Sequence, residues 1–117
     1  MKLQKQLLKF FMEKTKLRRD QDEVKLRTLA FKKLKNSDEI SPDQLQAKAE
    51  EYSAIKKLEK NIKKGQYRVM KQNTELMSIL KGVGLPRLKK ISFQYENYGT
   101  IQFWYKEDYA IYFEQTL

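Results

Sequence analysis

The sequence predicts an α+β fold in which a long, basic, antiparallel helical hairpin is followed by a C-terminal three-stranded antiparallel β-meander. Apolar residues recur every seven positions through most of residues 1–84, and the period changes to two after residue 90. The segment from Gly82 to Pro86 separates the two patterns with glycine and proline, which end helices. We expect a single domain over residues 1–117, with the helical region at 1–84 and the meander at 85–117.

The first helix is predicted over residues 2–35. Its apolar residues lie along one narrow seam, because a seven-residue repeat returns to nearly the same side of a helix. The repeat consists of Leu3, Phe10, Leu17, Val24 and Phe31, and Leu7, Leu29 and Leu34 lie beside it. A narrow seam of this kind is typical of a helix that packs against another helix.

A second helix is predicted to begin near Pro42, after a polar linker that starts at Asn36. Ser41 can cap free backbone amides, proline is favoured in the first turn, and Asp43 suits the positive end of the helix dipole. The seven-residue repeat then runs through Ile55, Ile62, Val69, Leu76 and Val83, with Tyr52, Leu58 and Ile79 beside it.

Gly65 leaves two alternatives for this helix. Lys60, Lys63 and Lys64 resemble the cationic last turn of a helix that stops at Gly65, and a third helix would then follow. The apolar repeat nevertheless passes through Gly65 without a change of phase. We therefore favour one continuous or gently kinked helix.

The two matching repeats and the short polar linker favour an antiparallel, coiled-coil-like hairpin. At about 1.5 Å per residue, each arm would be roughly 50 Å long. Two helices rarely shield a seam of that length, so the sequence also suggests a homodimer.

The region of period two predicts three strands. Their apolar sides are formed by Ile91, Phe93 and Tyr95, then by Ile101, Phe103 and Tyr105, then by Tyr109, Ile111 and Phe113. Asn97-Tyr98-Gly99 suits a three-residue hairpin loop with Gly99 in the left-handed conformation, and Lys106-Glu107-Asp108 would make the second turn. The apolar side must pack on another element, most simply the ends of the helices.

Composition excludes several classes of function. The chain contains neither cysteine nor histidine, so disulfides, a thiolate nucleophile, a catalytic histidine and the usual zinc ligands are all missing. The carboxylates follow no calcium-loop pattern, and Gly82-Val83-Gly84 lacks the other residues of a nucleotide-binding loop. We predict no enzymatic activity, no metal and no cofactor.

A cytoplasmic location is expected from two further observations. No segment resembles a signal peptide or a membrane span. The lack of cysteine fits a reducing compartment.

Positive charge is concentrated in the helical region. The net charge is +10, but residues 1–90 carry +13 and residues 91–117 carry −3. Residues 52–90 contain 11 basic residues and two acidic ones, whereas an ordinary solvated surface mixes the signs. Such a surface attracts polyanions. The candidate residues for contact with nucleic acid or another polyanion are Lys56, Lys57, Lys60, Lys63, Lys64, Arg68, Lys71, Arg87, Lys89, Lys90, Arg18 and Arg19.

Three aromatic residues, Tyr98, Trp104 and Tyr112, are candidates for binding a partner. On an exposed sheet they could stack on unpaired bases or anchor a protein interface. The competing interpretation, which we favour, is that helices cover both sides of the sheet and bury Trp104. The mildly acidic charge of residues 91–117 also weakens base stacking and favours a protein partner.

We therefore expect a non-enzymatic binding protein whose basic helices engage nucleic acid or a nucleoprotein complex. The alternative is a protein–protein interaction module, such as an inhibitor, adaptor or assembly factor, that docks on an acidic protein through its basic face or aromatic sheet. Either role suits a small regulator. The narrow seams argue against a helix lying on a membrane and against the compact three-helix core of a winged-helix DNA binder.

Overall fold

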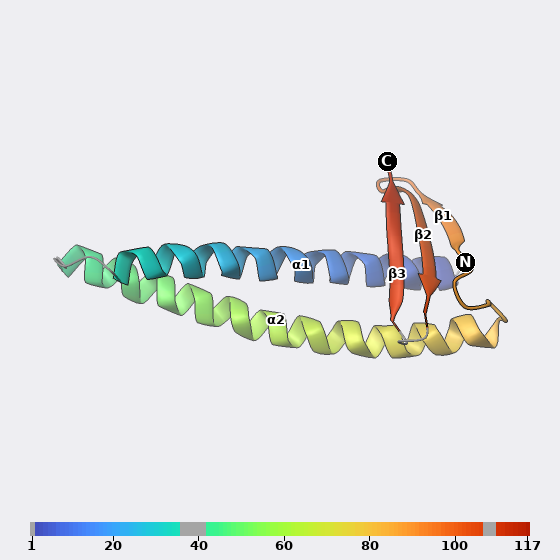
Figure 1. Cartoon of the computed structure of the whole chain (residues 1–117), viewed down its shortest axis with the longest axis horizontal. Coiled ribbons are helices and arrows are strands. Elements are labelled where there is room, and N and C mark those ends of the chain that lie inside the picture. Colours follow the sequence, from blue (N-terminus) through green and yellow to red (C-terminus); the bar gives the residue numbers. More distant parts are fainter. Residues whose placement is uncertain (1, 36–41, 107–109) are drawn as a thin grey trace. The chain divides into compact units, whose positions relative to one another are not determined.

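The computed structural model describes residues 2–35, 42–106 and 110–117 and contains two helices followed by three strands (Figure 1). The elements are α1 (Lys2–Lys35), α2 (Pro42–Gly82), β1 (Ile91–Tyr95), β2 (Gly99–Tyr105) and β3 (Ile111–Thr116). The predicted α+β class, with a helical hairpin and a three-stranded antiparallel sheet, is confirmed.

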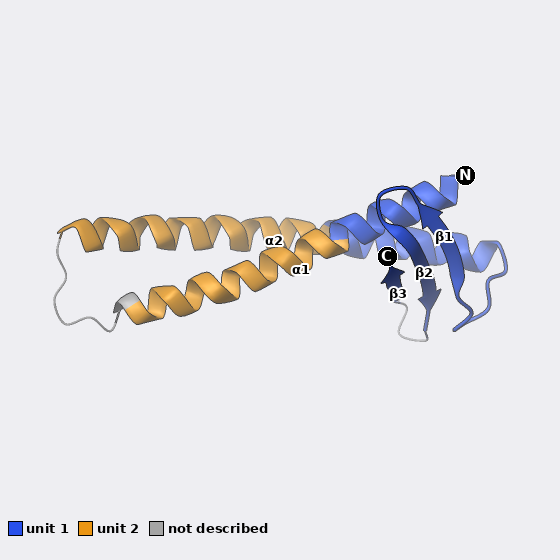
Figure 2. Ribbon diagram, turned by 90° about the horizontal axis from the view of Figure 1, so that it is seen from above, with its two compact units in different colours: residues 1–13, 68–117 blue, residues 14–67 orange. Residues whose placement is uncertain are grey.

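The chain divides into two compact units (Figure 2). The sheet unit consists of residues 1–13 and 68–117, and the hairpin unit consists of residues 14–67. Each helix contributes one segment to each unit.

In the hairpin unit, α1 and α2 run antiparallel, and α2 is continuous through Gly65. The alternative of a third helix after Gly65 is therefore wrong. Gly65 is buried, and a Cβ atom at this position would lie 3.3 Å from Cδ1 of Leu17. The glycine thus permits a close approach of the two helices and does not act as a helix stop.

The seam of the hairpin unit is narrow. Ile55 is the one large apolar residue of this unit that is buried among the described residues, while Leu17 and Ile62 are half-buried. Leu29, which we predicted to widen the seam, is 58% exposed. The Phe31 ring contacts the Tyr52 ring with their centroids 6.1 Å apart.

The C-terminus of α2 follows the predicted stop signal. Gly84 has a φ of 80°, Gly84 N–H donates to Lys81 O at 3.1 Å, and Leu85 N–H donates to Leu80 O at 3.0 Å. These two bonds satisfy carbonyls at the helix end in the manner of a Schellman motif. Val83 lies beyond this end and is 66% exposed, so it does not extend the apolar repeat as predicted.

The strand order is β1-β2-β3, with both pairs antiparallel. Phe103 faces Ile91 on one side and Phe113 on the other. The first turn spans residues 96–98, and Gly99 follows it with the predicted positive φ of 73°. Glu107 and Asp108 of the predicted second turn, and Tyr109 of the predicted third strand, lie outside the described residues.

One face of the sheet packs on the helical segments of its own unit (Figure 2). The fully buried side chains there are Leu7 and Phe10 of α1, Leu80 of α2, and Ile101, Phe103 and Ile111 of the sheet. At the edge of this core, the Tyr95 hydroxyl donates to Gln4 O at 2.7 Å, and the Tyr105 hydroxyl donates to Leu85 O. Burial raises the pKa of Tyr95 from 10.0 to about 12.

No helix among residues 2–35 and 42–82 has a stretch that is long and apolar enough to cross a membrane.

Candidate nucleic-acid interface

The first candidate surface is a group of five lysines on α2 in the hairpin unit, which we call the lysine face: Lys56, Lys57, Lys60, Lys63 and Lys64. Spacings of three, four, seven and eight residues bring side chains to one side of an α-helix. That side lies opposite Ile55 and Ile62, which turn toward the seam. All five lysines are exposed.

The lysine face has little internal charge compensation. Lys56 Nζ lies 3.5 Å from Glu59 Oε2, and both side chains are about half exposed. An exposed pair of this kind contributes about 0–1 kcal/mol, so it can be broken at little cost. No carboxylate among the described residues pairs with Lys57, Lys60, Lys63 or Lys64.

The other predicted helical cations lie on both helices and in both units. In the hairpin unit, Arg19 is exposed on α1, while Arg18 lines an open groove with Asp22, Lys25 and Ile62. In the sheet unit, Lys71 is exposed, and Arg68 Nε lies 3.5 Å from Glu13 Oε2. Arg68 is therefore already engaged by an acidic residue of its own unit.

The second candidate surface is the side of the sheet that faces away from the helices, which we call the outer sheet face. Its residues alternate with those of the core: Ser92 and Gln94 on β1, Thr100, Gln102 and Trp104 on β2, and Tyr112, Glu114 and Thr116 on β3. Trp104 and Tyr112 are directly opposite each other in the register.

Four side chains form a continuous stack on this face. The Trp104 and Tyr112 rings are stacked, with centroids 6.1 Å apart and planes inclined by 19°. Lys90 Nζ lies 4.7 Å from the centroid of the Trp104 ring, and Lys106 Nζ lies 4.6 Å from that of Tyr112. We call this group, in the order Lys90, Trp104, Tyr112, Lys106, the cation–aromatic stack.

The structure corrects two expectations about the aromatic residues. Trp104 is half-buried on the outer sheet face and is not part of the core, because the helices of the sheet unit cover the opposite face. Tyr98 does not join Trp104 and Tyr112. Its ring packs edge-on against Phe11 on the core side, with centroids 5.9 Å apart.

Sequence reasoning missed Lys106 as a site residue. It lies two positions after Trp104, and this spacing puts two side chains on the same side of an extended strand. Lys90 was predicted, but only as one of three cations before the sheet. The other two, Arg87 and Lys89, are exposed in the segment between α2 and β1. Extending the register by one residue beyond Ile91 and Phe103 brings Lys90 opposite Trp104. The contact between Lys90 and Trp104 could therefore have been predicted from the pairing of β1 with β2.

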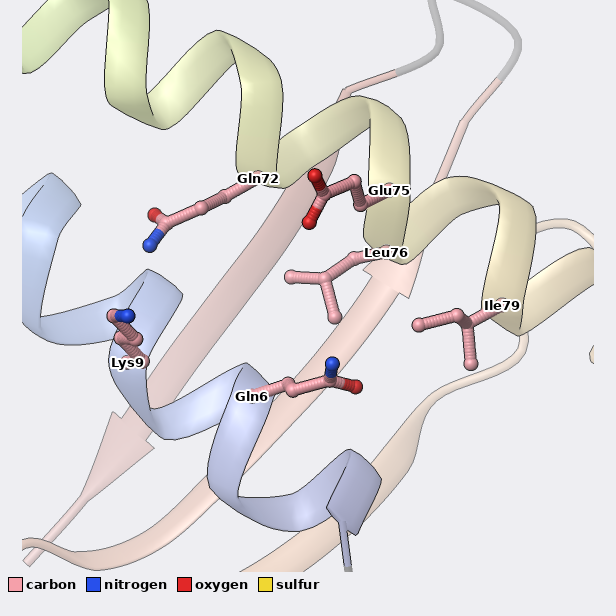
Figure 3. A pocket seen from close by; sticks show the side chains of 6 residues that line it. All are labelled: Gln6, Lys9, Gln72, Glu75, Leu76 and Ile79. Atoms are coloured by element: carbon pink, nitrogen blue, oxygen red, sulfur yellow. The ribbon is translucent and has the colours of Figure 1, made fainter.

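A small cavity also lies between the two helices of the sheet unit (Figure 3). Gln72 and Glu75 reach into it from α2, and Gln6 and Lys9 line it from α1. Its volume is about 120 Å³, well below the roughly 300 Å³ of a small-molecule site. Buried Gln72 Oε1 accepts no hydrogen bond from the described residues. The cavity can hold a few water molecules.

No protein-family model matches the chain, and the comparisons with curated proteins and with solved structures found no match. The function must therefore be inferred from the chemistry of the described surfaces.

Proposed function

We propose that this chain is a non-enzymatic protein that binds nucleic acid, free or within a nucleoprotein complex, through the lysine face of α2. The observation that carries the proposal is the set of five exposed lysines on one side of the helix, where Glu59 is the one carboxylate of the described residues that pairs with any of them. Lysines at reachable spacing contact phosphates without reading the base sequence.

The dimensions of the lysine face suit a phosphate backbone. Lys56 and Lys64 are eight residues apart, which corresponds to about 12 Å along a helix axis. One strand of a duplex carries a phosphate for about every 3.4 Å of its axis, so this length can face about three successive phosphates. The long lysine side chains extend that reach. The proposal includes a cytoplasmic location, which the absence of cysteine supports.

Fluorescence anisotropy with labelled single-stranded DNA, RNA and duplex DNA tests this proposal. The triple substitution Lys60→Gln, Lys63→Gln and Lys64→Gln should raise Kd for every polymer at least about tenfold near 0.1 M salt, because three phosphate contacts are lost. A matched control removes three exposed lysines of α1 in the same unit, through Lys25→Gln, Lys32→Gln and Lys33→Gln. If the two triple variants weaken binding equally, the affinity depends on the net charge of the protein and not on the lysine face.

A second candidate function is a protein–protein interaction module. Exposed apolar side chains of the hairpin unit favour it, because Leu26 is 70% exposed, Leu29 58% and Leu45 55%. Such side chains are candidates for contact with an acidic protein partner or with a second copy of the chain. Sedimentation velocity tests whether the partner is a second copy of the chain. A homodimer requires that the apparent mass rise with protein concentration, and the double substitution Leu26→Gln and Leu29→Gln should abolish that rise. Strong binding to poly-glutamate with weak binding to nucleic acid would favour the acidic protein.

A further inference from the structure

We propose that the outer sheet face binds an unpaired base of single-stranded nucleic acid at the cation–aromatic stack, with Lys90 and Lys106 contacting the adjoining phosphates. This inference rests on the proposed function, since it assumes that the polyanion is a nucleic acid. It adds the chemical class of the ligand, a single strand, and a second contact surface.

The position of the two rings is the first argument. Trp104 and Tyr112 lie on the solvent side of the sheet, while their strand neighbours Phe103 and Ile111 are fully buried on the other side. A cross-strand aromatic pair can stabilise a sheet by itself. That role, however, does not need a lysine ammonium over each ring, as Lys90 and Lys106 provide.

The surroundings of the rings are the second argument. On the outer sheet face, the register places Gln102 next to Trp104 and Glu114 next to Tyr112, so polar side chains border both rings along their strands. Protein hot spots are usually ringed by further contacts that exclude water. A narrow aromatic site with hydrogen-bonding neighbours and flanking cations is typical of proteins that bind single strands.

Charge is the third argument. Two cations contact the rings, and Lys90 Nζ also lies 3.7 Å from Oε2 of Glu114. This pair is largely exposed, so a phosphate can replace Glu114 as the partner of Lys90. Arg87 and Lys89 add two exposed cations just before the same strand.

The geometry also implies how a base would bind. A lysine ammonium lies over each of the two rings in the unbound protein. A base that stacks on Trp104 must displace the Lys90 ammonium, and the freed charge can then pair with a phosphate of the same strand. A duplex cannot do this, because its bases are stacked on one another and have no free face.

Trp104 is the sole tryptophan of the chain, so its fluorescence reports on this site directly. A ten-nucleotide oligothymidylate should quench that fluorescence by more than half at saturation, with saturation established independently by anisotropy. The control ligand is an abasic oligonucleotide of the same length, which keeps the phosphates and lacks the bases. It should bind more weakly and change the fluorescence by less than one tenth.

The outcomes separate the two proposals. Equal binding of both oligonucleotides without quenching would overturn the stacking site and leave phosphate binding by the lysine face intact. Binding of neither oligonucleotide would overturn the proposed function, and this inference would fall with it.

Substitutions provide an independent readout by anisotropy. Trp104→Leu and Tyr112→Leu should each raise Kd for the oligothymidylate about tenfold and leave that for the abasic strand unchanged, whereas Trp104→Phe should retain most of the affinity. Circular dichroism verifies that the Trp104→Leu variant is folded. If the folded variant binds oligothymidylate with unchanged affinity, the stack serves a different ligand and the inference is wrong.

Discussion

Lys90 and Lys106 each cover an aromatic ring in the unbound protein, and the size of these contacts decides whether a base can replace them. A cation–π contact at an exposed site contributes about 0.5–1 kcal/mol. Stacking of a base on an aromatic side chain contributes about 1–3 kcal/mol, and a displaced ammonium can regain a partner in a phosphate. Displacement of the lysine ammonium by a base is therefore favourable.

The buried hydroxyl of Tyr95 makes the stability of the protein sensitive to alkaline pH. Burial raises the pKa of Tyr95 to about 12, whereas an unfolded tyrosine titrates near 10. The unfolded state loses this proton first, so the contribution of Tyr95 to the free energy of unfolding should be constant below about pH 10 and fall as the pH approaches 12.

Urea denaturation at a series of pH values measures this effect. Tyr95→Phe, which also removes the hydrogen bond to Gln4 O, should be less stable near neutrality and lose less stability than the wild type between pH 10 and 12. Other tyrosines contribute equally to both proteins. An identical alkaline loss in the two would show that Tyr95 is not the responsible group.

At the scale of single elements, the pattern of apolar residues predicted most of the fold. The change of period from seven to two placed the sheet after the helices because a helix and a strand repeat their sides differently. The alternation of side chains along the second strand also placed Trp104 and Phe103 on opposite sides of the sheet. Alternation could not decide whether helices cover one side of the sheet or both. When both alternating sets of side chains contain aromatic residues, a strand with one side exposed and a strand with both sides buried give the same pattern. The error about Trp104 has this origin.

Gly65 illustrates a second limit of local sequence. A glycine after three lysines is typical of a helix end, yet here it lies inside α2. Its role depends on Leu17, which is 48 positions away in sequence and which a Cβ atom would approach to 3.3 Å. A contact between distant residues of this kind leaves no local signal.

Substitutions of Gly65 test this role of close helix packing. Gly65→Ala should stabilise the protein by about 0.5 kcal/mol, because the gain in helix propensity of up to about 1 kcal/mol exceeds the cost of shifting the tip of Leu17. Gly65→Leu should destabilise it by about 1–3 kcal/mol, because the larger side chain cannot fit beside Leu17.

Thermal unfolding followed by circular dichroism at 222 nm measures both changes. The control is Gly82→Leu, at a position where a Cβ atom would meet nothing within 4 Å. A stabilising effect of Gly65→Leu would contradict the close approach of the helices.

At the scale of the whole molecule, the chain combines two kinds of surface that suit one polymer. The hairpin unit carries the lysine face, which offers charge without an aromatic stack, and the sheet unit carries two stacked rings with a lysine over each. Composition predicted the first surface, because 11 basic residues and two acidic ones across residues 52–90 exceed the needs of solubility. The second depended on the register of β2 with its neighbours and could not be read from composition.

The most direct test of nucleic-acid binding by the lysine face is the salt dependence of Kd for a labelled single-stranded 20-mer. If each of the five lysines of this face contacts one phosphate, they should contribute about −3.5 to the slope of the logarithm of the association constant against the logarithm of salt concentration. The substitution of Lys60, Lys63 and Lys64 by glutamine should make the slope less steep by about 2.1. An unchanged slope in this variant, or no binding by the wild-type protein at low salt, would contradict the proposal.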